Sequence, residues 1–254
     1  MHRCYMCETL ATTREHVPPL NLFPERKDVE GENYRTNLIT IPSCELHNLA
    51  KSQDDEFLMV SLAGIIGNNS IGYRHKFGEV DRAIRRSSNR LLDKVFIKKK
   101  ELHVIELKNN KFIEVIWGTP DIERLNKCFD YIVRGLYFHH FKNAFVGNIK
   151  PMLGFIHHDE NNPKNFQQFI KDKVDLELLG KERFGNNPEI FYYQITDTDQ
   201  FGLRLFRLCF YGGINVYASL IPESVKESGD LGMELIKRGV KTVITLGEKT
   251  YEFN

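Results

Sequence analysis

Residues 11–23, ATTREHVPPLNLF, place a Glu-His pair shortly before two prolines. Glu15 carries a carboxylate, which suits a hard metal ion, and His16 carries an imidazole that exchanges a proton near neutral pH. Pro18 and Pro19 restrict the backbone as it leaves the pair. We interpret the segment as one that holds two chemically active side chains in place.

Two short ligand pairs flank this segment. Cys4 and Cys7 form Cys-x-x-Cys, and Cys44 and His47 form Cys-x-x-His. Two intervening residues let both side chains of a pair reach one ion, and two such pairs supply the four ligands of a tetrahedral zinc site. The alternative is two unrelated cysteine-rich turns. We favour structural zinc, because a short segment with little core needs such a staple.

The bulk composition is ordinary for a globular protein. The chain has 254 residues, 41% of them hydrophobic, and a net charge of +1 from 35 basic and 34 acidic residues. A polyanionic partner would therefore need a local basic site. No apolar run is long enough for a membrane span, and the N-terminus lacks the apolar region of a signal peptide, so we expect a cytoplasmic protein. An odd count of five cysteines argues against a disulfide framework.

The elements that would position the pair are two strands and a helix. A strand-like piece at 12–14 leads into Glu15-His16, and residues 37–41 are short, β-branched and apolar. Pro42 is expected to end the second strand and Ser43 to cap a helix, whose apolar spacing runs from residue 44 towards 65.

Taken in order, Cys-x-x-Cys, Glu-His, Asn-Leu and Cys-x-x-His-Asn-x-x-Lys resemble the motif of the HNH endonucleases, the zinc-stapled branch of the ββα-metal nucleases. The resemblance covers about residues 3–56. His47 stands where many relatives have cysteine, Glu15 where aspartate is commoner, and Asn48 where some relatives carry a third histidine.

This resemblance implies roles for individual residues. His16 would be the general base, and Glu15 and Asn48 would hold a catalytic Mg²⁺ or Mn²⁺. Asn37 would orient the His16 ring. Lys51 could meet a phosphate, although a solvated helix residue is the simpler interpretation. The implied fold is a small zinc-stabilised, treble-clef-like ββα-metal module.

The remaining chain predicts a second, larger unit. Residues 64–72, rich in glycine and asparagine, are the most linker-like, so we expect an HNH module at 1–66 and an α+β domain at 67–254. This domain would bind nucleic acid, mediate oligomerisation or have a regulatory role. Residues 78–97 predict one helix carrying basic residues at four-residue steps, and these either track phosphates or form a solvated face. They are Arg82, Arg86, Arg90, Lys94 and Lys98.

Further elements are expected along the second unit. Thr119-Pro120-Asp121 should open a helix ending near Phe141, with Thr119 as cap, and His139 and His140 are interpreted as helix-end histidines rather than a second metal site. A second helix is expected at 166–179, and a glycine turn at 212–213 should join two antiparallel strands. Strands are expected at 111–117, 152–156, 189–195, 203–211 and 214–220.

The sequence thus favours a metal-dependent HNH endonuclease acting on DNA, or on RNA, and leaving 5′-phosphate and 3′-hydroxyl ends. By analogy it would serve bacterial restriction or anti-phage defence, as a homo-oligomer or with a partner protein. The alternative is a non-catalytic, zinc-stabilised nucleic-acid-binding or adaptor subunit. The balanced net charge favours this alternative slightly.

Overall fold

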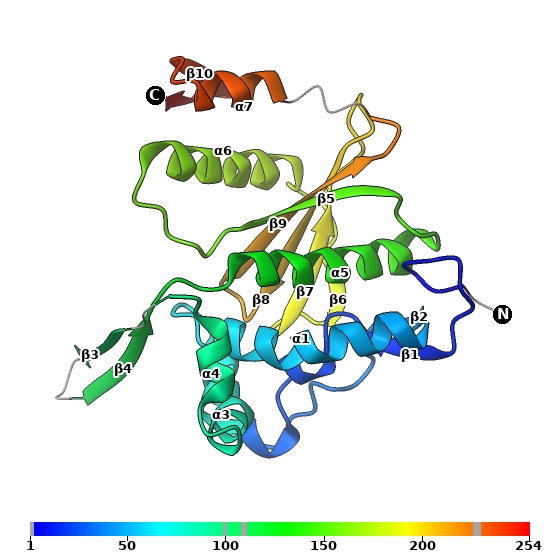
Figure 1. Cartoon of the computed structure of the whole chain (residues 1–254), viewed down its shortest axis with the longest axis vertical. Coiled ribbons are helices and arrows are strands. Elements are labelled where there is room, and N and C mark those ends of the chain that lie inside the picture. The colour runs from blue at the N-terminus through cyan, green and yellow to red at the C-terminus, as the bar shows by residue number, and fades with distance from the viewer. Residues whose placement is uncertain (1–2, 99–100, 108–110, 226–229) are drawn as a thin grey trace.

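The computed structural model describes residues 3–98, 101–107, 111–225 and 230–254. The chain is α+β, with antiparallel sheets and packed helices (Figure 1), as the sequence predicts. No helix within the described ranges is long and apolar enough to cross a membrane.

A two-stranded hairpin and a long helix form the N-terminal part. β1 (Thr13–His16) pairs antiparallel with β2 (Thr40–Ser43), and α1 (Glu45–Ala63) follows at once. Pro42 was expected to end the second strand, but it lies inside β2, where a two-stranded sheet leaves one side of the strand unpaired. Cys44, not Ser43, caps α1, because Ser43 still pairs with Thr13.

Two short 3₁₀ turns, η1 (Leu20–Leu22) and η2 (Arg26–Asp28), occupy the long connection between β1 and β2. After α1 the chain forms α2 (Ser70–His75), the π-helical η3 (Lys76–Val80), α3 (Asp81–Arg86) and α4 (Arg90–Val95). The prediction of one helix over 78–97 is wrong. Ser88 and Asn89 adopt left-handed backbone angles (φ 52° and 68°), which end α3 and restart the chain as α4.

The residues expected to form a linker are ordered by specific contacts. The Asn69 backbone N–H donates to the Tyr211 carbonyl, and its side chain donates to the Glu189 carbonyl (2.7 Å). Any side chain at Gly213 would collide with the Gly67 carbonyl. The predicted boundary region is therefore packed against the turn that joins two sheet strands.

A hairpin and a long helix come next. β3 (Glu101–Leu107) pairs with β4 (Lys111–Trp117), and the hairpin projects from the body in Figure 1. The prediction for 111–117 is confirmed. α5 (Ile122–Phe141) is also confirmed, but its cap is Asp121 and not Thr119, since the Asp121 carboxylate accepts from the Arg124 backbone N–H.

The second half contains a five-stranded antiparallel sheet in the order β5-β9-β8-β7-β6. The strands predicted at 189–195, 203–211 and 214–220 and the turn at Gly212 are confirmed. The strand expected at 152–156 begins earlier in the chain. The helix expected at 166–179 is α6 (Asn161–Glu177). The strands are β5 (Gly147–Leu153), β6 (Phe184–Asn187), β7 (Phe191–Ile195), β8 (Arg204–Phe210) and β9 (Ile214–Pro222).

The two faces of this sheet are covered by different helices. Phe206, Leu208 and Phe210 of β8 pack with α5, whereas Leu205 and Tyr217 face the other way and pack against α6. This follows the two-residue alternation of strands. The C-terminal α7 (Asp230–Lys237), β10 (Thr242–Leu246) and β11 (Lys249–Phe253) lie on the outer side of α6 (Figure 1).

The N-terminal hairpin packs on the opposite side of α5. A methyl group at Gly135 of α5 would lie 2.8 Å from side-chain atoms of both Val17 and Ile41, so glycine allows a close approach here. One hydrophobic cluster accordingly runs from Cys4 through α1 and α5 to Leu220 of β9. The predicted module at 1–66 shares its core with the rest of the chain.

Candidate metal centre and active site

The four predicted zinc ligands converge. Cys4 and Cys7 lie in the turn before β1, Cys44 caps α1, and His47 lies in the first turn of α1. The His47 Nδ1 atom is 3.2 Å from Cys44 Sγ, 3.5 Å from Cys4 Sγ and 3.6 Å from Cys7 Sγ. Cys7 Sγ and Cys44 Sγ are 3.9 Å apart.

These spacings suit one four-coordinate ion. Bonds of ~2.3 Å to sulfur and ~2.0 Å to nitrogen in a tetrahedron place neighbouring ligand atoms roughly 3.5–3.8 Å apart. The group could therefore hold a metal ion such as zinc. Four protein ligands leave no open position for substrate, which is the arrangement of a structural site.

The carboxylate of Glu15 faces α1 and is buried. Its Oε1 accepts from Lys51 Nζ at 3.1 Å, while its Oε2 is buried and has no hydrogen-bond partner among the described residues. A buried carboxylate oxygen without a partner is costly, so this atom is a candidate for a bond to an ion or a water. The buried Tyr5 hydroxyl makes no hydrogen bond of normal geometry to the described residues, and burial together with the neighbouring Glu15 carboxylate raises the pKa of Tyr5.

The Lys51 side chain lies between α1 and β1 instead of in solvent. The residue is only 5% exposed, and its ammonium donates both to Glu15 and to the His16 carbonyl (3.0 Å). The interpretation of Lys51 as a solvated residue is therefore wrong, and its contact with nucleic acid stays a prediction. A buried ammonium must find acceptors, and Glu15 supplies them from a strand distant in sequence.

His16 is the last residue of β1 and is half-buried. Burial and the nearby Lys51 charge lower its pKa below the ordinary 6.5, so the ring is neutral at pH 7. Within the described part of the chain, no hydrogen bond of the ring is found. A neutral imidazole is able to accept a proton from a water molecule.

The two predicted asparagines lie in different surroundings. Asn48, on the first turns of α1, donates from Nδ2 to the Thr13 hydroxyl at 3.3 Å, which leaves its amide oxygen for another partner. Asn37 is exposed and left-handed (φ 53°), and its carbonyl accepts from Asn186 at the edge of the large sheet. The geometry brings Asn48 to β1, whereas the hydrogen bond given for Asn37 leads to β6 and not to His16.

Asp55 is a site residue that the sequence reasoning missed. It lies one turn of α1 beyond Lys51, and burial, with the Glu15 and Asp54 carboxylates, raises its pKa to about 6 against the opposing Lys51 charge. The spacing of Asn48, Lys51 and Asp55 at steps of three and four residues puts them on one helix face. That spacing was the available signal.

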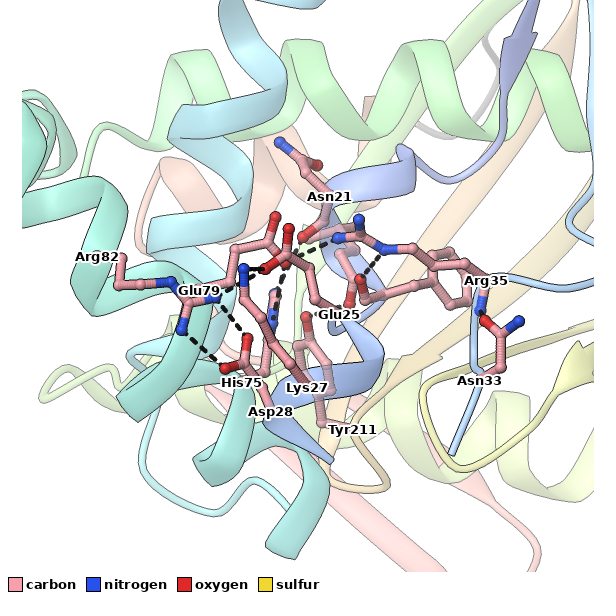
Figure 2. Close-up of polar contacts among 12 residues, drawn as sticks. Asn21, Glu25, Lys27, Asp28, Asn33, Arg35, His75, Glu79, Arg82 and Tyr211 are labelled. Carbon is pink, nitrogen blue, oxygen red and sulfur yellow. Dashed lines mark hydrogen bonds and ion pairs between the residues drawn. The ribbon is translucent and has the colours of Figure 1, made fainter. Parts of the chain in front are cut away.

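A second cluster fixes the chain after Pro19. Figure 2 shows the carboxylates of Glu25, Asp28 and Glu79 gathered beside the Arg82 and Arg35 guanidinium groups. Arg82 binds Asp28 through two nitrogen atoms at 2.7 Å and Glu25 at 2.8 Å, and Arg35 binds Glu79 at 2.7 Å. The three carboxylates are close enough together to bind an ion, but the positive charges of Arg82, Arg35 and Lys27 already balance them.

These contacts also change the interpretation of the five basic residues that were predicted to form a stripe along one helix, Arg82, Arg86, Arg90, Lys94 and Lys98. Arg82 is occupied by Asp28 and Glu25, so it is not offered to a phosphate, and the break at Ser88 divides the stripe between two helices. The other four residues are exposed, and their contact with nucleic acid stays a prediction. They are Arg86, Arg90, Lys94 and Lys98.

The double histidine lies in the last turn of α5, as predicted. His139 and His140 line a polar hollow of about 410 Å³ with Arg183 and Asn186, and Ile39 closes its side towards β2. Burial lowers the pKa of both histidines. Among the described residues these two join no group of three or more potential metal ligands.

No protein-family model, no curated protein and no solved structure matches this chain. The function is therefore argued from the site alone.

Proposed function

We propose that the chain is a metal-dependent endonuclease of the HNH type that hydrolyses phosphodiester bonds, with DNA as the favoured substrate. The observation that carries the proposal is the joint placement of a four-ligand metal cluster, the Glu15-His16 strand end and Asn48 on one hairpin–helix unit. A zinc ion at Cys4, Cys7, Cys44 and His47 would staple this unit.

The residues divide the chemistry between them. His16 takes the proton of the attacking water, since its ring is neutral at pH 7. The unpartnered Glu15 Oε2 and the Asn48 amide oxygen are hard ligands for Mg²⁺ or Mn²⁺. When bound, such an ion neutralises the phosphate and favours departure of the 3′ oxygen. The products carry 5′-phosphate and 3′-hydroxyl ends.

A substrate panel tests this proposal. Purified protein is incubated with Mg²⁺ or Mn²⁺ and with single- and double-stranded DNA and RNA, and the ends of any products are determined. Metal-dependent cleavage of DNA with 5′-phosphate ends is expected. A protein that cuts no member of the panel with either ion would refute the enzyme proposal, and metal analysis should separately find about one zinc per chain.

A second function is a non-catalytic, zinc-stabilised nucleic-acid-binding or adaptor subunit. The buried Lys51–Glu15 pair favours it, because an ammonium already occupies one oxygen of the proposed metal ligand. Binding of DNA without cleavage in the same panel would support this function. A role in restriction or anti-phage defence, in a homo-oligomer or with a partner protein, is proposed by analogy.

A further inference from the structure

The Lys51 ammonium joins two parts of the proposed active site. It donates to the Glu15 carboxylate at 3.1 Å and to the His16 backbone carbonyl at 3.0 Å. The side chains of Lys51 and Glu15 are 6% and 4% exposed, so water competes little for these bonds. Hydrogen bonds that involve an ionised group are roughly twice as strong as bonds between neutral groups.

We propose that Lys51 is a positioning residue, which fixes the Glu15 carboxylate and the end of β1 in one arrangement. The inference rests on the proposed function and deepens it, because it identifies the contact that holds the proposed base, His16, and the proposed metal ligand, Glu15, in a fixed relative position. Lys51 is not assigned any contact with substrate.

α1 connects the metal cluster to the Lys51–Glu15 pair. The metal cluster fixes the start of this helix through Cys44 and His47, and Lys51 lies one turn beyond His47. A helix transmits position rigidly over such a short span. Lys51 thus ties the end of β1, where His16 lies, to a helix that the metal holds at its N-terminus.

The pair also determines which oxygen of Glu15 is available. Lys51 occupies Oε1, whereas Oε2 is buried and accepts no hydrogen bond from the part of the chain that the structure describes. A carboxylate free to rotate would offer either oxygen in several directions. Held by Lys51, it presents one oxygen in one direction, and catalytic groups displaced by small amounts lose much of their effect.

Matched variants separate positioning from folding. Lys51→Met keeps the length and burial of the side chain but removes the ammonium, and Lys51→Arg keeps a charged donor. Arg124→Met is the control, because Arg124 also makes an ion pair with α1, and its partner there is Asp54 (2.8 Å) instead of Glu15. Lys51→Gln, which retains a polar group, serves if Lys51→Met does not fold.

The first measurement is the NMR spectrum of protein with ¹⁵N-labelled histidine, in which His16→Ala assigns the His16 ring. We expect the His16 signals to shift or split in Lys51→Met, to stay close to wild type in Lys51→Arg, and to be unchanged in Arg124→Met. His16 signals that are identical in Lys51→Met and wild type would overturn the proposal. This measurement does not require cleavage, so it decides the role of Lys51 even if the nuclease proposal fails.

The second measurement is the cleavage rate at saturating Mn²⁺. For Lys51→Met we expect kcat to fall at least tenfold with zinc content unchanged, and Lys51→Arg to recover part of the loss. Arg124→Met is expected to lower the melting temperature but to retain kcat. Equal losses of kcat in Lys51→Met and Arg124→Met would show that Lys51 acts only through stability and would overturn the positioning role. Wild-type protein that cuts nothing refutes the nuclease proposal and leaves the NMR result to stand alone.

Discussion

The proton affinity of His16 depends on two neighbouring features. Partial burial disfavours the charged ring, and the Lys51 ammonium repels a second positive charge. Both act in the same direction, so His16 remains neutral to a lower pH than an exposed histidine. A general base benefits from this, because it must be unprotonated before it can accept the proton of water.

The cleavage rate should therefore depend on pH in a defined direction. Because the neutral ring is the active form and its pKa is lowered, activity should be lost on acidification with a midpoint below the ordinary histidine pKa of 6.5. The measurement is kcat between pH 5 and 8 at saturating Mn²⁺. A midpoint above 6.5 would contradict the assignment of His16 as a base in this environment.

At the residue scale, the sequence predicted which side chains close together in the chain share a ligand site, but it did not predict contacts between residues far apart in the chain. Cys4 and Cys7, or Cys44 and His47, are close in sequence, so their types alone indicated shared ligation. Lys51 was misinterpreted because its acceptors belong to β1, across the hairpin. Periodicity placed it on a helix, but it could not show that this face is buried.

The connection after β1 is an element fixed largely by polar contacts. His75 Nε2 lies 3.0 Å from the Asn21 carbonyl, the Tyr211 hydroxyl donates to the Leu22 carbonyl (2.7 Å), and Arg35 donates to the Phe23 carbonyl. Figure 2 shows His75 and Tyr211 reaching this loop from other elements. Three neighbouring carbonyls are thus held, which extends the rigidity suggested by Pro18 and Pro19.

The stability of the folded chain should depend on pH through His75. Burial lowers its pKa to about 4, so between pH 6.5 and 4 the unfolded chain binds a proton at His75 that the folded chain does not. The free energy of unfolding should therefore decrease as the pH is lowered from 6.5 to 4, by roughly 1.4 kcal/mol per pH unit from this residue.

Urea unfolding of wild type and His75→Gln measures this dependence. Glutamine can still donate to the Asn21 carbonyl but does not titrate. The difference between the two proteins removes the contributions of Glu25, Asp28, Glu79 and Arg35, which surround the ring. Equal slopes for the two proteins would contradict a neutral, buried His75.

The contact between α5 and the hairpin depends on Gly135. Gly135→Ala would place a methyl group 2.8 Å from Val17 and Ile41 side-chain atoms, and such overpacking costs about 1–3 kcal/mol against a helix-propensity gain of about 1 kcal/mol. We expect a net loss of stability and a larger loss of kcat, because Val17 adjoins His16. Chemical denaturation and kinetics measure the two effects.

Gly64→Ala is the control, since its methyl group would meet only carbonyls of the preceding helix end. A fully active Gly135→Ala protein would show that the hairpin position does not depend on α5.

At the element scale, prediction succeeded where a local signal dominates. The regular apolar spacing of α5 and the glycine turn at Gly212 were recognisable from sequence. The helix expected over 78–97 failed because Ser88 and Asn89 adopt left-handed angles, which apolar periodicity does not report. The cap of α5 was displaced by two residues because three successive residues could each open a helix.

The whole molecule is arranged in layers that sequence did not predict. The hairpin and α1 pack on α5, α5 packs on the large sheet, and α6 covers the other face (Figure 1). The class α+β followed from local patterns, but the order of layers depends on contacts such as Gly135 with Ile41. A boundary near residue 66 stays a prediction, although the main core extends across it.

Removal of the metal should therefore affect more than the first sixty residues. With a shared core, we expect the zinc-loaded protein to unfold in one transition and the chelated protein to melt at a lower temperature. Differential scanning calorimetry with and without a chelator measures this. Two separated transitions, of which only the first responds to the chelator, would instead support independent domains at 1–66 and 67–254.

The central claim is that His16 is the base of a phosphodiester hydrolase. Single-turnover cleavage of end-labelled DNA is measured for wild type, His16→Ala and His157→Ala, an exposed histidine in a loop outside the site, all with equal zinc content. General acid–base catalysis contributes typically 10²–10⁴-fold, so we expect His16→Ala to lose about that factor and His157→Ala to match wild type. Cleavage by His16→Ala at the wild-type rate would contradict the claim.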